Sequence, residues 1–233
     1  MIQTEGIFVG GSAISAPIIG EDFNWSGGDG TYQVLDDGGG NWRIKFLSSG
    51  TFTPLKNMVI DVFLVGGGGG AGSSYCGAGG AGYTTTVRSV VVAANTAYPI
   101  VVGAAGTQTY TVQSDGGTSS AFSAVANGGH HSVSGDKTWK KTGANGGSGG
   151  GGQYADGGTD GSDGTSSATT GGKGQGTTTR EFGEADGTLY ASGGGSNLTA
   201  TVSNSGNGGR NGITSIEPAD GIVVIRQHKE VAA

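Results

Sequence analysis

Cysteine, proline and cationic side chains are scarce in this sequence of 233 residues, which holds one cysteine, four prolines and 12 lysines and arginines against 18 acidic residues. The single cysteine, Cys76, cannot form a disulfide within the chain, so the fold needs no oxidising compartment. The net charge of -6 and the lack of a Lys/Arg stripe argue against a nucleic-acid partner, because nothing would displace counterions from phosphates. Lys137, Lys140 and Lys141 form only a local cluster.

Long apolar runs are also missing. Nowhere do about 18 apolar residues follow one another, and residues 1–5 have no basic region ahead of an apolar stretch. We therefore expect synthesis in the cytoplasm, no membrane partner, and release by a route such as cell lysis.

Glycine is the abundant residue, with 53 positions, whereas 33% of the residues are hydrophobic and 13% are charged. Average glycine usage is about 7%. Glycine loses the most backbone entropy on folding and has no side chain to bury, so this composition alone would also suit a disordered, low-complexity chain. The apolar residues, however, gather at the two ends of a glycine-rich middle, which favours an ordered fold.

The apolar segments have the character of β-strands. Residues 31–35 and 41–47 predict a hairpin with a five-residue turn at 36–40. Residues 58–65 form a continuous run rich in Val, Ile and Phe, which is typical of a strand buried on both faces. Further strands are predicted at residues 83–92, 97–102, 119–126 and 221–227. No stretch has a 3.6-residue apolar period with helix caps, so the predicted fold class is all-β.

The last predicted strand resembles residues 59–65 in its β-branched content, although about 155 residues separate the two. We expect them to be neighbours in one sheet of a jelly-roll-like β-sandwich whose middle is a long glycine-rich insertion. The predicted organisation is an N-terminal attachment segment with the hairpin (1–48), a glycine-rich domain (49–226) and a C-terminal tail (227–233).

Small residues recur every third position within the insertion. This spacing is the repeat of the polyproline II helix, which has three residues per turn and no internal hydrogen bonds. A glycine face of such a helix allows a neighbouring backbone to approach closely enough for main-chain hydrogen bonds between helices. We expect a bundle of short polyglycine II helices; the alternative is a flexible Gly/Ser linker. The phased positions are Gly146, Gly149, Gly152, Ala155, Gly158, Gly161 and Gly164, with shorter runs at Gly66, Gly69 and Gly72, at Gly103 and Gly106, and at Gly206, Gly209 and Gly212.

Motifs that suggest chemistry are weak. Gly67-x-Gly69-x-x-Gly72 follows a strand, but no helix can start after it to bind a pyrophosphate. Residues 157–165 look like one calcium-binding nonapeptide, a site that needs stacked copies. His130 and His131 are weak candidates for a metal site, because no further ligand or carboxylate stands at a fixed spacing from them. We therefore predict no enzyme activity, no cofactor and no bound metal.

Several segments carry a family resemblance. Taken together, they are similar to the glycine-rich tail proteins encoded by phages and prophages of Gram-positive bacteria. More distantly, the order strand, glycine block, strand is similar to the glycine-rich domain of anaplastic lymphoma kinase receptors and to tail-fibre tip adhesins, a resemblance that implies a β-sandwich carrying polyglycine helices. The segments are residues 49–54, 62–70, 79–86, 174–184, 187–191, 193–195 and 221–226.

The resemblance implies a phage virion protein of the tail, with receptor binding as its function. Recognition of a bacterial surface carbohydrate or protein would then fall to loops that interrupt the glycine phase and carry aromatic or polar side chains. The protein is also expected to contact other tail proteins and to assemble as a homotrimer. A purely structural virion protein, such as a head fibre, decoration or baseplate component, is the alternative. The candidate contact residues are Tyr75 with its neighbour Cys76, His130, His131, Trp139 and Tyr154.

Overall fold

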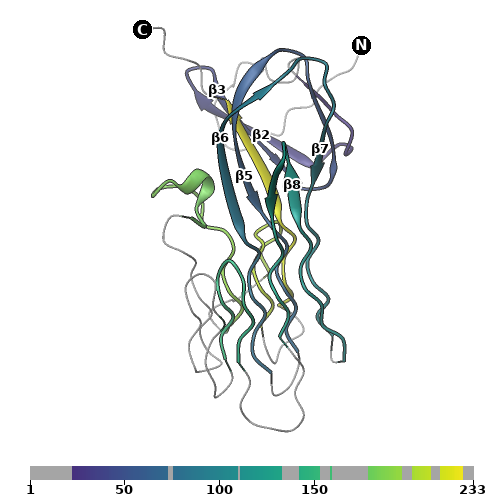
Figure 1. The fold of residues 1–233 in the computed structure, drawn as a ribbon, viewed down its shortest axis with the longest axis vertical. Coiled ribbons are helices and arrows are strands. Elements are labelled where there is room, and N and C mark those ends of the chain that lie inside the picture. Colours follow the sequence, from purple (N-terminus) through teal and green to yellow (C-terminus); the bar gives the residue numbers. More distant parts are fainter. Residues whose placement is uncertain are drawn as a thin grey trace, which may run out of the picture.

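A computed structural model describes residues 23–72, 76–109, 111–132, 142–152, 158, 178–195, 201–210 and 216–227. Figure 1 shows two parts, a β-sandwich at one end and a bundle of long extended segments at the other. The expected attachment segment before residue 23 and the tail after residue 227 lie outside the described residues.

The sandwich consists of two five-stranded antiparallel sheets, so the predicted all-β sandwich is confirmed. The strand order is β1-β4-β7-β8-β9 in the first sheet and β2-β3-β10-β5-β6 in the second sheet. The strands are β1 (Phe23–Trp25), β2 (Tyr32–Gly38), β3 (Asn41–Phe46), β4 (Gly50–Pro54), β5 (Met58–Val65), β6 (Thr84–Val92), β7 (Tyr98–Val101), β8 (Ser119–Ala121), β9 (Ala124–Ala126) and β10 (Ile222–Gln227).

The predicted neighbourhood of the last strand and residues 59–65 is confirmed. β10 lies between β3 and β5, and Ile222 is directly opposite Val65. The β2–β3 hairpin also forms as predicted, but its strands extend to Gly38 and Asn41 with a bulge after Asp36. The five-residue turn was therefore wrong, and only two residues connect the strands.

Residues 119–126 form two strands instead of the predicted one. The chain reverses at Phe122 and Ser123, both of which have positive φ, so that Ala121 is opposite Ala124. Positive φ at both central residues is the geometry of a tight hairpin turn, which usually contains Asn or Gly. Because neither residue is present, the sequence contained no signal for this turn.

The main core lies between the two sheets. Alternate residues of each strand point inward, as the period of two requires. The rings of Phe46 and Phe52, one from each sheet, meet edge to face with their centroids 5.8 Å apart. Large members of this core that are almost fully buried are Ile44, Phe46, Phe52, Ile60, Val62, Leu64, Ile100, Val223 and Ile225.

A second, smaller core covers the outer face of the second sheet. Phe63 and Val65 of β5 point away from the main core and pack against Phe182 and Tyr190. The prediction that β5 is buried on both faces is therefore confirmed for its second half only. In its first half, Val59 is exposed on the outer face.

Hydrogen bonds in the bundle repeat every three residues. Successive N–H groups of the segment after β5 donate to different neighbouring segments, and the fourth donor returns to the segment contacted by the first. This three-residue repeat is that of a polyglycine II helix, so the predicted bundle is confirmed. The donors and their acceptor carbonyls are Gly66 to Tyr83, Gly67 to Gly117, Gly68 to Ala219, Gly69 to Gly80 and Gly70 to Ser114, at 2.8–3.0 Å.

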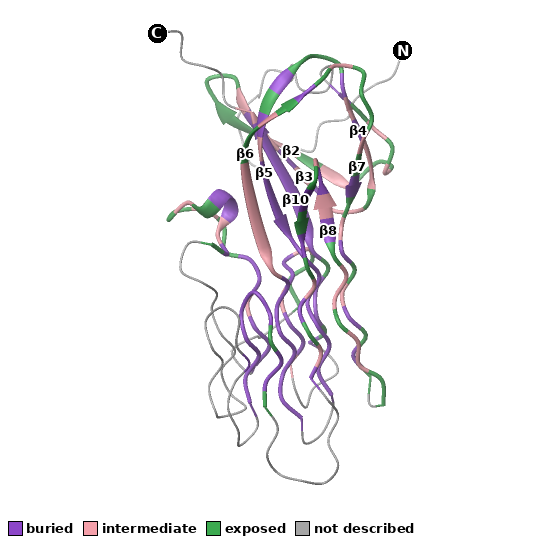
Figure 2. Ribbon diagram, viewed as in Figure 1, coloured by how far each residue is buried: buried purple, intermediate pink, exposed green. Residues whose placement is uncertain are grey.

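Glycine is required in the bundle for close approach of backbones. A Cβ atom added at any of Gly66, Gly67, Gly68, Gly69 or Gly70 would overlap a carbonyl oxygen of a neighbouring segment. The prediction that glycine is needed on only one face of each helix is thus wrong for this segment. The segment has neighbours on all sides, so each of these positions must be glycine. Figure 2 shows the inner segments buried along their described length.

An outer segment does show the single buried face. Ala126, Gly129 and Ser132 are buried, whereas Asn127 and His130 are exposed. In the phased run at 146–164, added Cβ atoms would overlap neighbouring carbonyl oxygens at the in-phase Gly146, Gly149 and Gly158 but also at the off-phase Gly147 and Gly150, so here too glycine is required on more than one face. Ala155, Gly161 and Gly164 lie outside the described residues.

Candidate functional site

Residues 178–191 form a clip over the outer face of the second sheet. The clip contains a single 3-10 turn, η2 (Glu181–Gly183), and Phe182 adopts a φ of 55° there. This left-handed conformation is uncommon for a bulky residue and costs about 1–2 kcal/mol. Packing of the Phe182 ring against Phe63 compensates for the strain.

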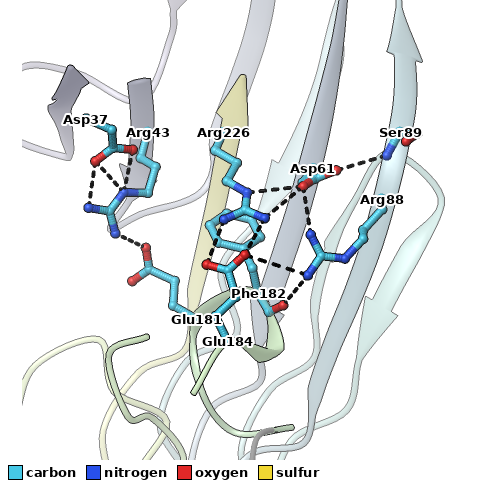
Figure 3. A network of polar contacts seen from close by, with 9 residues as sticks. All are labelled: Asp37, Arg43, Asp61, Arg88, Ser89, Glu181, Phe182, Glu184 and Arg226. Atoms are coloured by element: carbon cyan, nitrogen blue, oxygen red, sulfur yellow. Dashed lines mark hydrogen bonds and ion pairs between the residues drawn. The ribbon is translucent and has the colours of Figure 1, made fainter. Parts of the chain in front are cut away.

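Glu181 fastens one side of the clip through buried charges (Figure 3). Its carboxylate is 1% exposed and pairs with Arg43, which also binds Asp37, and with Lys45 at 3.0 Å. Tyr190 donates its hydroxyl to the same carboxylate at 3.2 Å. Burial alone would raise the pKa of Glu181, but the hydrogen bond from Arg43 and the charge of Lys45 lower the pKa overall.

Arg226 fastens the other side of the clip. Its guanidinium lies 4.1 Å from the centroid of the Phe182 ring and binds Glu184 of the clip and Asp61 of β5 (Figure 3). Arg88 donates to Asp61 and to the Phe182 carbonyl. Each charge in this network has a partner, and Arg226 and Asp61 are largely buried, so the arrangement is that of a structural clamp.

The described segments of the bundle end together at the end far from the sandwich, here called the distal end. Hydrogen bonds set their levels: Ser132 donates to Gly70, and Ala78 both accepts from Ala144 and donates to Gly151. The segments ending at residues 72, 76, 132, 142 and 152 are therefore level with one another. At about 3.1 Å per residue, the seven positions from Gly66 to Gly72 place the distal end about 22 Å beyond β5.

Three predicted contact residues, Tyr75, Trp139 and Tyr154, lie outside the described residues. The described segments that end at residues 72, 76, 132, 142 and 152 reach the distal end. Cys76 is 1% exposed and its thiol donates to the Gly72 carbonyl at 2.7 Å, so the suggestion that it contacts a receptor was wrong.

His130 and His131 share one carboxylate. Nδ1 of His130 lies 3.1 Å from Oδ2 of Asp115, while Nδ1 of His131 and its backbone N–H, the latter at 2.8 Å, both bind Oδ1. Burial raises the pKa of Asp115, but these hydrogen bonds outweigh it and lower the pKa, so the carboxylate is ionised at neutral pH. An ionised carboxylate only accepts hydrogen bonds, so both Nδ1 atoms carry protons.

A depression of about 270 Å³ lies beside the histidines, lined by residues 130–132 and 142–145. These two stretches are the described ends of the connection that contains Trp139. The structure therefore places both histidines beside this depression.

Sequence reasoning missed Asp115. It stands 15 residues before His130 on a different segment, and only the register between the two segments brings it to the histidines. The hydrogen bond from Gly116 to Gly129 sets this register. Glycines alone do not specify such a register, so no local motif could have revealed the carboxylate.

Among the described residues, no group of three or more His, Cys, Asp or Glu side chains is placed to hold a metal ion. No helix in the described part of the chain is long and apolar enough to cross a membrane.

Comparison with known families gives a match over most of the chain. The model of the glycine-rich domain matches residues 47–226, from the end of β3 to β10. The chain belongs to the glycine-rich domain family. The match of this glycine-rich domain includes the clip and the described bundle segments. No curated protein matches the chain.

Proposed function

We propose that this protein is a tail appendage of a phage virion that binds a receptor on the bacterial surface through the distal end of its bundle. The resemblance to glycine-rich phage tail proteins supplies the setting. The geometry of the two ends of the molecule supports the role of a tip.

The polarity of the molecule carries the proposal. β10 starts at Ile222 beside Val65, where the bundle begins, and runs away from the bundle to Gln227. Gly50, at one end of β4, pairs with β7, the strand that leads into the bundle. Phe23 pairs with Pro54, at the other end of β4, which is remote from the bundle. The described chain thus enters and leaves at the end opposite the distal end of the bundle (Figure 1). This arrangement leaves the termini for attachment and the distal end for contact.

Rigidity of the bundle supports the same role. Main-chain hydrogen bonds satisfy the N–H groups of the inner segments, and no added Cβ would fit between them. Loops on such a frame lose little conformational entropy on binding, which favours affinity. A flexible linker would lack this advantage.

A pull-down on intact host cells tests the proposal. The purified protein should bind host cells and not unrelated bacteria. Replacing Trp139 and Tyr154 with alanine should weaken binding by about thirtyfold per residue, since aromatic anchors often contribute 2 kcal/mol or more. Leu189→Ala removes a 42% exposed apolar side chain at the sandwich end and should bind as the wild type does.

The structural alternative predicts a different result. A head fibre, decoration or baseplate component would show no host-selective binding, and virions lacking it would adsorb normally. That pair of observations would replace the receptor-binding proposal.

A further inference from the structure

We propose that the depression lined by residues 130–132 and 142–145 binds one sugar unit of the host surface, with Nε2 of His130 and of His131 accepting hydrogen bonds from its hydroxyl groups. This inference rests on the proposed function and names the ligand class that one part of the distal end recognises.

The tautomer of the two imidazoles is the first argument. Both Nδ1 atoms contact Asp115, and the tautomer that this contact selects carries its proton on Nδ1 and a lone pair on Nε2. The side chains of His130 and His131 are 56% and 39% exposed. Both imidazoles are therefore accessible to a ligand, and both residues line the depression.

The rigidity of the walls is the second argument. His130 donates its backbone N–H directly to the carbonyl of Asn145 at 2.9 Å, and its own carbonyl accepts from Gly80 at 3.0 Å. Ser132 donates its backbone N–H to Gly70 at 3.0 Å and is 2% exposed. The main-chain hydrogen bonds of the bundle thus hold residues 130–132 and 142–145 in place before any ligand binds. A site that is preorganised in this way loses less conformational entropy on binding.

The chemistry of the lining favours hydroxyl groups. Thr142 supplies a hydroxyl, which can both donate and accept beside the two imidazole acceptors. A sugar hydroxyl can donate and accept at once. The carboxylate of Asp115 is already occupied by three donors, and the described residues that line the depression include no lysine or arginine that would select a polyanion.

The size of the depression limits the ligand. Its volume of about 270 Å³ lies just below the range of about 300–1,000 Å³ for small-molecule pockets. It suits one ring of a glycan and not a longer chain.

The test is NMR of the imidazole nitrogens of the full chain, titrated with glucose, galactose, N-acetylglucosamine and rhamnose. At least one sugar should shift the Nε2 resonances of His130 and His131 with a dissociation constant in the millimolar range. His130→Ala and His131→Ala should each weaken that binding about tenfold, as measured on the remaining histidine.

Asn127→Ala is the matched control, because Asn127 is exposed on the same face of the same segment, one three-residue turn before His130. It should bind the sugar as the wild type does. Asp115→Asn tests positioning: the ring nitrogens should show a mixture of tautomers, and sugar binding should weaken several-fold while the thermal unfolding temperature changes little.

Two results would overturn the inference. One is the absence of any shift up to a sugar concentration of about 100 mM, far above a millimolar dissociation constant. The other is equal binding by the wild type and both histidine variants. If host cells are still captured in either case, the proposed receptor binding stands and only the sugar site fails. If a sugar binds but host cells are not captured, the sugar site stands and the proposed receptor binding fails.

Discussion

Replacing Gly68 with alanine tests the central claim that the bundle needs glycine for close approach of backbones. Gly68 donates to Ala219 at 2.9 Å and accepts from Gly106 at 2.8 Å. A Cβ atom there would overlap the carbonyl oxygen of Asn207 on a third segment. All of these contacts are with main-chain atoms, so no side chain can rotate to make room.

The cost follows from the contacts that must change. Overpacking a tight interior costs about 1–3 kcal/mol, and each lost hydrogen bond adds about 1 kcal/mol. The lower entropy of the unfolded alanine chain returns about 0.4–1 kcal/mol. We expect Gly68→Ala to lower the free energy of unfolding by about 2–4 kcal/mol.

Gly30→Ala is the control. Gly30 has a φ of +76°, and an added Cβ would meet nothing within 4 Å, so this substitution costs only the strain of a left-handed alanine, about 1 kcal/mol. Urea unfolding followed by circular dichroism measures both variants. If Gly68→Ala destabilises the protein no more than Gly30→Ala does, the bundle is not closely packed and the argument fails.

Further predictions concern the clip, the bundle and assembly. Glu181→Gln should lower the free energy of unfolding in urea by about 3 kcal/mol, because it leaves Lys45 and Arg43 with less compensating charge. The exposed Glu217→Gln should change the free energy of unfolding by almost nothing, and equal effects of the two substitutions would contradict the role of Glu181 in the structural clamp. Glu181 and Asp61 have lowered pKa values, so their contribution to stability is complete above the unfolded carboxyl pKa of about 4 and is lost as the pH falls through their folded pKa values. The urea concentration at the unfolding midpoint should therefore decrease once the pH is lowered below about 4, and it should decrease less steeply in Glu181→Gln. In hydrogen exchange, the amides of residues 66–70 should be protected to the same degree as those of β5, because they donate to neighbouring segments. Rapid exchange at residues 66–70 would contradict these main-chain hydrogen bonds. Light scattering should give the mass of a homotrimer, and a stable monomer at micromolar concentration would refute that assembly.

The sequence was informative wherever side chains alone determine structure. The β-branched runs of β5 and β10 identified strands and their pairing across the whole insertion. The three-residue spacing of glycine identified the bundle. Short strands such as β1, with three residues, contain too little pattern to be recognised. The Phe122–Ser123 turn was missed because its positive φ values have no Gly or Asn to mark them.

The candidate site was only half visible in the sequence. His130 and His131 stood out as an adjacent pair, but their orientation depends on Asp115 in another segment. The clip illustrates the same limit. Glu181 gains its importance from Arg43 and Lys45, more than 130 residues earlier, and a pairing at that distance follows from the fold and not from any local pattern.

The three-residue repeat means that the length of the bundle and the direction of its loops change in steps. Adding three residues to each segment would lengthen the bundle by one helical turn, about 9 Å, and every loop at the distal end would still face the same way. Adding one or two residues would rotate a loop by a third or two thirds of a turn and would bring side chains where the lattice accepts only glycine. A protein built in this way can alter its reach in whole turns while its loops vary independently, and a few side chains such as Gln108, which binds Ala71 and Ile216 on two other segments, keep the segments aligned.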